Sequence, residues 1–199
     1  YTRWMQAGAF MPMFRSHGTD TPREPWQFGA PGTPFHDAIV AAIRLRYRML
    51  PYLDSEAGHA YLDGGSLIRP VAFGYPHDTR THDLKGEMLL GQGILVSQVK
   101  APLYYGTGST TVDGPRTARV YLPQGTWFDF WTGQSHRGGR TITVDAPIDR
   151  MPIHVRAGTV LPLGPLKPFA DEIVDALIEV RVYPGADGAY TLYDDAGER

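Results

Sequence analysis

Residue types that can bind a neutral polar ligand lie close together near the start of the sequence. The run Arg15-Ser16-His17-Gly18 is followed shortly by Arg23, Glu24 and Trp26. A planar guanidinium, a carboxylate and an indole in so short a loop suit a polyhydroxylated neutral ligand better than a phosphate. His17 is the first candidate contact, although a lone histidine at such a place is often a structural hydrogen-bonding residue instead.

The residues before this loop form an apolar run from Ala9 to Phe14. An apolar run that ends abruptly in polar residues predicts a strand that is buried on both faces and opens onto a loop. The ends of such strands carry the chemistry of α/β sheets and barrels. Before the run, Thr2 to Gln6 is typical of the last part of a helix, with Gly8 as its cap.

The other chemistry-bearing residues form weaker patterns. Asp20 and Glu24 could serve as an acid/base pair, but a spacing of four in an irregular segment fixes no geometry. Gly106-Thr107-Gly108 lacks the third glycine of a dinucleotide fingerprint, and the sequence contains no P-loop and no GxSxG turn. The histidines lack the spacing of metal ligands, so we expect no metal and no cofactor. Six of them are predicted to be surface or turn residues: His36, His59, His77, His82, His136 and His154.

The aromatic run Trp127-Phe128-Asp129-Phe130-Trp131 allows two interpretations. Its flat rings could form a platform for the apolar face of a sugar. At alternating strand positions, however, the two tryptophans share one face and the two phenylalanines share the other. Packing in a core or between domains explains this pattern at least as well and is the interpretation that we favour.

Composition narrows the class of partner. The chain has 199 residues, of which 42% are apolar, and a formal net charge of −2 without charge runs. These values indicate a globular protein without the positive electrostatic field that attracts nucleic acid or an anionic membrane. Small neutral partners fit this charge balance best. No segment reaches the roughly eighteen apolar residues of a membrane helix. The absence of cysteine excludes disulfides and leaves the localisation open. The sequence also leaves open whether the chain forms a homo-oligomer.

A long helix is predicted after the loop. Gly32-Thr33-Pro34 offers a cap and a first-turn proline, apolar residues recur at helical spacing from Phe35, Pro51 should kink the helix, and Gly64-Gly65 should end it. Its arginines are predicted to lie on a solvated face or to form ion pairs: Arg44, Arg46 and Arg48. Because the sequence begins within a helical pattern and stops on a turn signal at residues 194–199, we expect it to be a C-terminal part of something larger.

From Ser66 onward the sequence predicts β structure. Short runs separated by turn signals are typical of an antiparallel sandwich. Residues 104–114 are predicted to be a polar loop. After a connector at 166–171, the runs 178–183 and 189–193 around a Gly/Asp turn predict a hairpin. The predicted strands before the connector cover residues 67–73, 88–90, 94–96, 119–123, 126–131, 141–144 and 153–156.

Taken together, five motifs in order resemble the C-terminal third of a glycoside hydrolase of family 31, which contains α-glucosidases and α-xylosidases. The motifs are RWMQAGAFMPMFRSHG, REPWQFG, RYRMLPYL, VYLPQGTWFDFWTG and PIHVRAGTVLPLG. The loop version RSHG…PREPWQFG and the later YPGADGAYTLYDDAG are more similar to the bacterial α-xylosidase branch. The resemblance implies α/β plus all-β structure: residues 1–64 are the end of a (β/α)8 TIM barrel with its last strand and helix, 65–165 a proximal β-sandwich, and 166–199 the start of a distal β domain.

The resemblance also implies a function and a site. The family's FRxH histidine, which is His17 here, contacts the sugar next to the scissile bond, while Arg15 and Trp26 are weaker candidates for the same site. The implied activity is retaining, exo-acting hydrolysis of terminal α-linked xylosyl or glucosyl residues from a small neutral oligosaccharide. Both catalytic aspartates belong to motifs outside this chain, which should therefore be inactive alone. A non-catalytic carbohydrate-binding or scaffold segment is the alternative. Three departures from the family pattern concern packing rather than the site: Asp54, Glu87 and Gln98.

Overall fold

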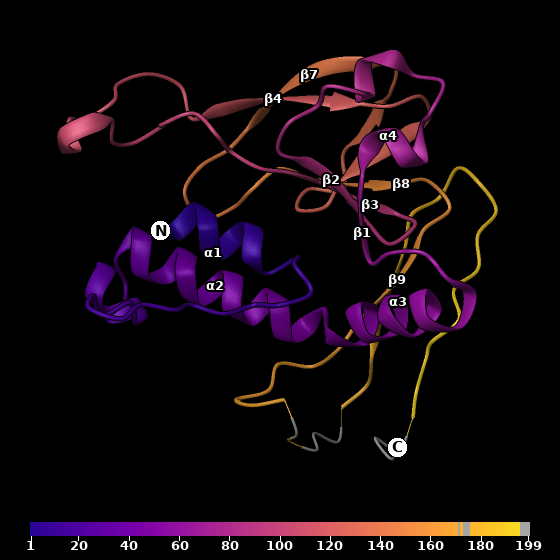
Figure 1. Cartoon of the computed structure of the whole chain (residues 1–199), viewed down its shortest axis with the longest axis horizontal. Coiled ribbons are helices and arrows are strands. Elements are labelled where there is room, and N and C mark those ends of the chain that lie inside the picture. The colour runs from indigo at the N-terminus through magenta and orange to yellow at the C-terminus, as the bar shows by residue number, and fades with distance from the viewer. Residues whose placement is uncertain (171, 173–175, 196–199) are drawn as a thin grey trace.

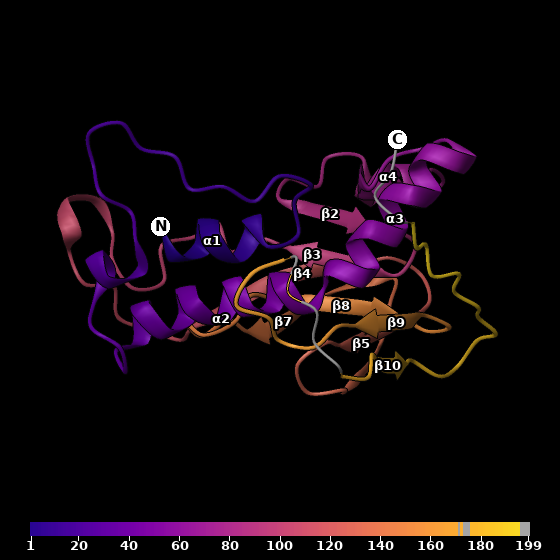
Figure 2. The ribbon, with the colours of Figure 1, turned by 90° about the horizontal axis from the view of Figure 1, so that it is seen from below.

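The computed structural model describes residues 1–170, 172 and 176–195, and it places three main helices along one side of a mostly antiparallel β structure (Figure 1). Helices α1 (Thr2–Gly8) and α2 (Pro34–Arg48) pack against each other, and the short 3-10 helix η1 (Pro25–Phe28) also contacts α2. Helix α3 (Leu50–Asp63) continues the path of α2. Seen from below in Figure 2, the segment that joins α1 to η1 arches over α1.

The helix predicted from Phe35 onward is confirmed, with its break at Met49, two residues earlier than the predicted kink at Pro51. Pro34 opens α2, Met49 separates α2 from α3, and Pro51 lies in the first turn of α3, where its missing N–H costs nothing. Gly64 ends α3 with a φ of 77°, which favours glycine. Thr33 is the N-cap only by position, because its hydroxyl donates to the carbonyl of Ala30 instead of accepting from the helix.

The strand predicted from Ala9 to Phe14 is wrong for the described chain. The N–H groups of Ala9, Phe10 and Met11 donate to carbonyls of Met5, Ala7 and Gly8, so the backbone winds out of α1 in turns, and Ala9 rather than Gly8 caps the helix. An extended segment becomes a strand only when a neighbouring strand pairs with it, and none of the described strands does so.

The β structure has a central sheet and two separate strand pairs. The central sheet has the order β1-β2-β3-β8-β5-β6, and its pairings are all antiparallel among the described residues. Its strands are β1 (Ile68–Pro70), β2 (Glu87–Leu90), β3 (Ile94–Ser97), β5 (Thr126–Asp129), β6 (Ser135–Arg137) and β8 (Ile153–Arg156). The two pairs join β4 (Thr117–Leu122) to β7 (Arg140–Asp145) and β9 (Val160–Leu163) to β10 (Glu179–Val182), and the short helices are α4 (Val71–Gly74), η2 (Thr79–Thr81) and η3 (Thr107–Ser109).

Most predicted strands are confirmed, two local predictions fail, and two strands were not predicted. Residues 71–73 turn into α4 instead of extending β1, and strands β6 and β9 had no clear signal in the sequence. The hairpin of residues 178–183 with 189–193 is wrong, because β10 pairs with β9. Residues 189–193 instead lie against α3, where the Tyr190 hydroxyl donates to the carbonyl of Tyr52 at 3.2 Å. The end of the predicted connector, residue 171, and most of the turn signal at 194–199 lie outside the described residues.

Side chains on the two faces of the central sheet form separate cores. The larger core joins the sheet to the helices and includes Phe10, Met49 and Phe130. The second core lies between the sheet and the β4–β7 pair and is built around Trp127, whose exposed fraction is 0%. Core packing is therefore confirmed for Trp127, Phe128 and Phe130, whereas Trp131 lies beyond the end of β5, is 38% exposed and belongs to neither core.

The prediction that His154 is a surface or turn histidine is wrong. It lies in the middle of β8, its exposed fraction is 0%, and neither ring nitrogen has a hydrogen-bond partner among the described residues. Burial lowers the pKa of His154 to about 4; Asp129 on β5 acts against this shift, and His136 on β6, whose ring lies 5.7 Å away, adds to it. The side chain is buried because the second core covers that face of the sheet.

His154 is expected to contribute a loss of stability as the pH drops from 6.5 toward 4, because only the unfolded chain readily protonates this side chain in that range. The loss should reach about 2 kcal/mol at pH 5. Urea unfolding at pH 5 and pH 7.5 would measure it. His154→Leu should remove this contribution, so from pH 7.5 to pH 5 the free energy of unfolding of the variant should rise by about 2 kcal/mol relative to that of the unsubstituted protein. Because burial raises the pKa of Glu87 to about 7, that group contributes with the opposite sign in both proteins, and the comparison isolates the histidine. The same change of stability with pH in the two proteins would contradict the prediction.

Candidate functional site

The segment that leads to the candidate loop is held by one arginine of α2. The Arg46 guanidinium donates to the carbonyls of Met11 at 2.5 Å, Pro12 at 3.0 Å and Ala9 at 3.3 Å. Burial lowers the pKa of Arg46, although the guanidinium remains charged at any ordinary pH. The prediction that Arg46 belongs to a solvated face is therefore wrong. This side chain binds backbone carbonyls that no strand partner satisfies among the described residues.

Arg15 and His17 form a pair beyond this anchor. Nη2 of Arg15 lies 2.8 Å from Nδ1 of His17, and both side chains are exposed. A guanidinium can only donate, so Nδ1 must accept, and the proton of the neutral ring is then carried by Nε2. The pair therefore presents an N–H donor on the outer edge of the imidazole.

Tyr1 closes the loop that carries His17. Its hydroxyl bonds to Oγ of Ser16 and donates to the carbonyl of Arg23, both at 2.8 Å. Its ring stacks on Phe28 of η1, with centroids 4.1 Å apart. Both ends of the loop are thus tied to the first residue of the chain. Gly18 lies in a tight part of this loop, where a β-carbon would come within 2.8 Å of the Arg23 side chain and the Thr21 carbonyl.

A hollow of about 550 Å³ lies beside this loop. Ser16 and Gly18, the neighbours of His17, line it, but His17, Arg15 and Trp26 do not. Trp26 is 65% exposed on η1, and the structure gives it no direct contact with the Arg15–His17 pair. The other lining residues include Asp20, Arg23 and Glu24, so the hollow combines both signs of charge with hydroxyl groups.

This arrangement offers hydrogen-bond donors and acceptors for a polar ligand, together with one exposed indole face. Asp20 and Glu24 both line the hollow, and neither carboxylate makes a hydrogen bond or an ion pair with another described residue. No group of three or more His, Cys, Asp or Glu residues suited to a metal ion exists among the described residues. None of the described helices is long and apolar enough to cross a bilayer.

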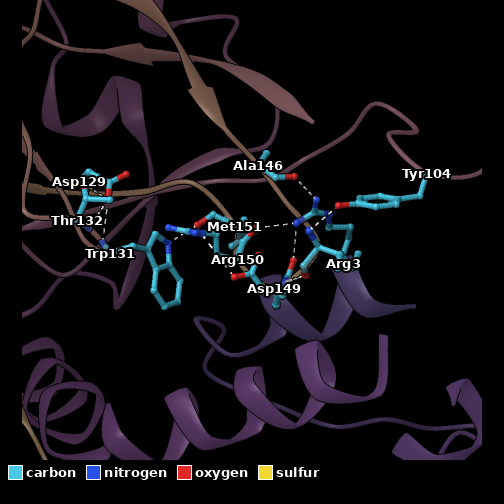
Figure 3. A network of polar contacts seen from close by, with 11 residues as sticks. Arg3, Tyr104, Asp129, Trp131, Thr132, Ala146, Asp149, Arg150 and Met151 are labelled. Atoms are coloured by element: carbon cyan, nitrogen blue, oxygen red, sulfur yellow. Dashed lines mark hydrogen bonds and ion pairs between the residues drawn. The ribbon is translucent and has the colours of Figure 1, made fainter. Parts of the chain in front are cut away.

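Helix α1 is fixed to the β structure by polar contacts of Arg3 and Gln6, some of which are drawn in Figure 3. The Arg3 guanidinium donates to the carbonyls of Ala146 at 2.6 Å and Arg150 at 2.7 Å, and the Gln6 amide donates to that of Ile148 at 2.7 Å. Because α1 runs directly into the candidate loop, the segment between β7 and β8 sets the position of that loop.

Sequence reasoning missed the roles of Tyr1 and Arg46. A signal for Arg46 was present, because it follows the buried residues Ile39 and Ala42 at helical spacing and precedes buried Met49. Tyr1 had no such signal, since its contacts with Ser16 and Arg23 depend on the path of the intervening chain.

Two family models match the chain in sequence order. Residues 1–56 match the glycosyl hydrolases family 31 TIM-barrel domain, and residues 64–161 match the glycosyl hydrolase family 31 C-terminal domain. The chain belongs to glycoside hydrolase family 31. Similar curated proteins include an α-xylosidase of Saccharolobus solfataricus, 38% identical, and α-glucosidase 2 of Bacillus thermoamyloliquefaciens, 37% identical. Each match covers 99% of this chain but only 25% and 24% of the relative, so the chain spans about a quarter of their length.

Solved structures of the family have the same fold. A family 31 α-xylosidase of Xanthomonas citri aligns over 98% of this chain and 20% of its own, with a TM-score of 0.87 and 41% identity. A dextranase of Flavobacterium johnsoniae in complex with isomaltotriose aligns over 99% of this chain and 23% of its own, with a TM-score of 0.85 and 33% identity. The resemblance to the bacterial α-xylosidase branch of family 31 is thereby confirmed.

Proposed function

We propose that this chain is the C-terminal segment of a retaining, exo-acting glycosidase that removes terminal α-linked xylosyl residues from oligosaccharides. The observation that carries this proposal is the Arg15–His17 pair, held at 2.8 Å at the end of a segment that Arg46 anchors. Family 31 relatives that cleave α-linked sugars support the general activity, while the preference for xylose is the finer part of the proposal.

His17 is proposed to bind the sugar next to the scissile bond. Its Nε2–H can donate to a ring hydroxyl, and such a contact strengthens as the oxocarbenium-like transition state forms. Arg15 would hold the tautomer through Nδ1. Trp26 would offer a flat apolar face to the sugar or its leaving group.

The covalent chemistry is proposed to come from two aspartates outside this chain. In a retaining mechanism one carboxylate attacks the anomeric carbon while the other carboxyl protonates the leaving oxygen, and water then hydrolyses the glycosyl-enzyme, with the two groups about 5 Å apart. Residues 1–64 would complete the barrel, 65–165 form a proximal sandwich, and 166–199 begin a distal β domain. The chain alone would then bind sugar weakly at best and catalyse nothing.

Hydrolysis of p-nitrophenyl α-xyloside and α-glucoside tests this proposal. The full-length protein is expected to cleave the xyloside with the higher kcat/KM, and the 199-residue chain alone is expected to cleave neither. Faster cleavage of the glucoside would make it an α-glucosidase of the same family. If the full-length protein binds oligosaccharides but cleaves neither substrate, the alternative of a non-catalytic carbohydrate-binding or scaffold protein is correct.

A further inference from the structure

A second hollow, of about 360 Å³, shares Tyr1 with the hollow that Asp20 and Glu24 line, and aromatic side chains form much of its wall. Its five aromatic side chains come from separate parts of the chain: Tyr1, Phe28 of η1, Phe35 at the start of α2, and Tyr104 and Tyr105 from the loop after β3. The sequence predicts only a polar loop for residues 104–114. In the structure it brings two tyrosines to the helical part of the molecule.

The rings of this second hollow are held in place by their neighbours. Phe35 contacts Tyr104 edge to face, with centroids 5.9 Å apart, and contacts Tyr105 at 6.0 Å. The Arg116 guanidinium lies 4.4 Å from the centroid of the Tyr104 ring, and the hydroxyl of that tyrosine accepts from the N–H of Ile148 at 2.8 Å. Tyr105 remains 55% exposed. The wall is therefore fixed on one side and open to solvent at Tyr105.

The chemistry of the second hollow fits a neutral ligand with both apolar and hydroxyl-bearing faces. None of its described lining residues is acidic. Its one cation, Arg3, is engaged by the carbonyls of Ala146 and Arg150, and Arg116 nearby donates to the carbonyl of Val112 at 2.9 Å. What is left for a ligand is ring faces, ring edges and phenolic hydroxyls. A pyranose matches this set, because its C–H faces stack on aromatic rings while its hydroxyls hydrogen-bond at the edge.

The second hollow and the hollow of the candidate site meet at one residue, Tyr1. This residue lines both hollows, and its hydroxyl binds Ser16, the neighbour of His17. Phe28, which stacks on Tyr1, belongs to the same 3-10 helix as Trp26. We propose that this aromatic hollow is a second sugar subsite, which binds a unit of the same oligosaccharide distal to the sugar held at His17. The inference rests on the proposed function, and the isomaltotriose bound by the Flavobacterium johnsoniae relative shows that a family member accommodates three sugar units.

A substrate-length series tests this subsite. Tyr105→Ala and Phe35→Ala in the full-length enzyme are expected to lower kcat/KM about tenfold for an α-xylosyl-terminated tetrasaccharide, equal to about 1.4 kcal/mol. Both variants should cleave p-nitrophenyl α-xyloside, which carries a single sugar, within twofold of the unsubstituted enzyme. Tyr61→Ala on α3 is the matched control, because Tyr61 is 85% exposed and lines neither hollow, and it should change neither rate.

The outcomes separate the subsite from the proposed function. If the Tyr105 and Phe35 variants cleave the tetrasaccharide as fast as the unsubstituted enzyme, the subsite is wrong while the glycosidase activity stands. If both substrates lose rate equally, the aromatic residues support the fold and the subsite is again wrong. An unsubstituted enzyme without activity on either substrate overturns the proposed function itself.

Discussion

Replacing His17 with alanine is expected to lower kcat/KM of the full-length enzyme about 100-fold, equal to about 2.7 kcal/mol of transition-state stabilisation. The reason is the loss of one positioned N–H donor, which Arg15 orients through the opposite ring nitrogen. Because the His17 side chain is exposed, the thermal midpoint should stay nearly unchanged. Steady-state kinetics with p-nitrophenyl α-xyloside and a thermal melt measure both quantities.

Two further variants sharpen this experiment. His77→Ala replaces another exposed histidine, which lies between α4 and η2, and should leave kcat/KM unchanged. His17→Gln keeps an N–H donor without the ring and should recover part of the lost rate. A melt that drops in step with the rate would show that His17 supports folding and does not bind the sugar.

Elements that local chemistry determines could be predicted from the sequence. Pro34 and Gly64 act through their own φ preferences, so both limits of the α2–α3 pair follow from single residues. Most strands of the central sheet could also be predicted, because an apolar run and the turn residues that bound it are close together in the sequence. The nearness of Arg15 and His17 also follows from the sequence, since they are two residues apart, but the hydrogen bond between them was not predicted.

Features that depend on distant partners could not be predicted in this way. The run from Ala9 to Phe14 predicted a buried strand, but Phe10 is 1% exposed while Met13 is 76% exposed, and the carbonyls between them are bound by Arg46. His154 lies in a predicted strand, but the sequence of that strand does not show which of its two faces another part of the chain covers. In both cases the missing information is which part of the chain covers the segment.

The partner of β10 shows the same limit. Alternating residues at 178–183 predicted a strand correctly, and the nearest turn signal pointed to 189–193 as its partner. Strand β9, which lies earlier in the chain, pairs with it instead, and its register aligns Val182 with Val160. Tyr190 and Tyr193 are held on α3, where the N–H of Tyr193 donates to Oγ of Ser55 at 3.0 Å. A hairpin would pull both tyrosines away from that helix.

The two tryptophans of the run at 127–131 are expected to differ sharply in their effect on stability. Trp127→Ala should lower the free energy of unfolding by about 4 kcal/mol, because it empties the centre of the second core and leaves the Pro123 carbonyl without its indole donor. Trp131→Ala should cost about 1 kcal/mol, since Trp131 is 38% exposed and loses mainly its hydrogen bond to the Met151 carbonyl. Urea unfolding of the two variants measures the difference in stability. Each variant should still bind oligosaccharide with unchanged affinity once its folded fraction is taken into account. Equal losses of stability would contradict the burial of Trp127, and a specific loss of sugar binding in either variant would restore the platform interpretation of this run.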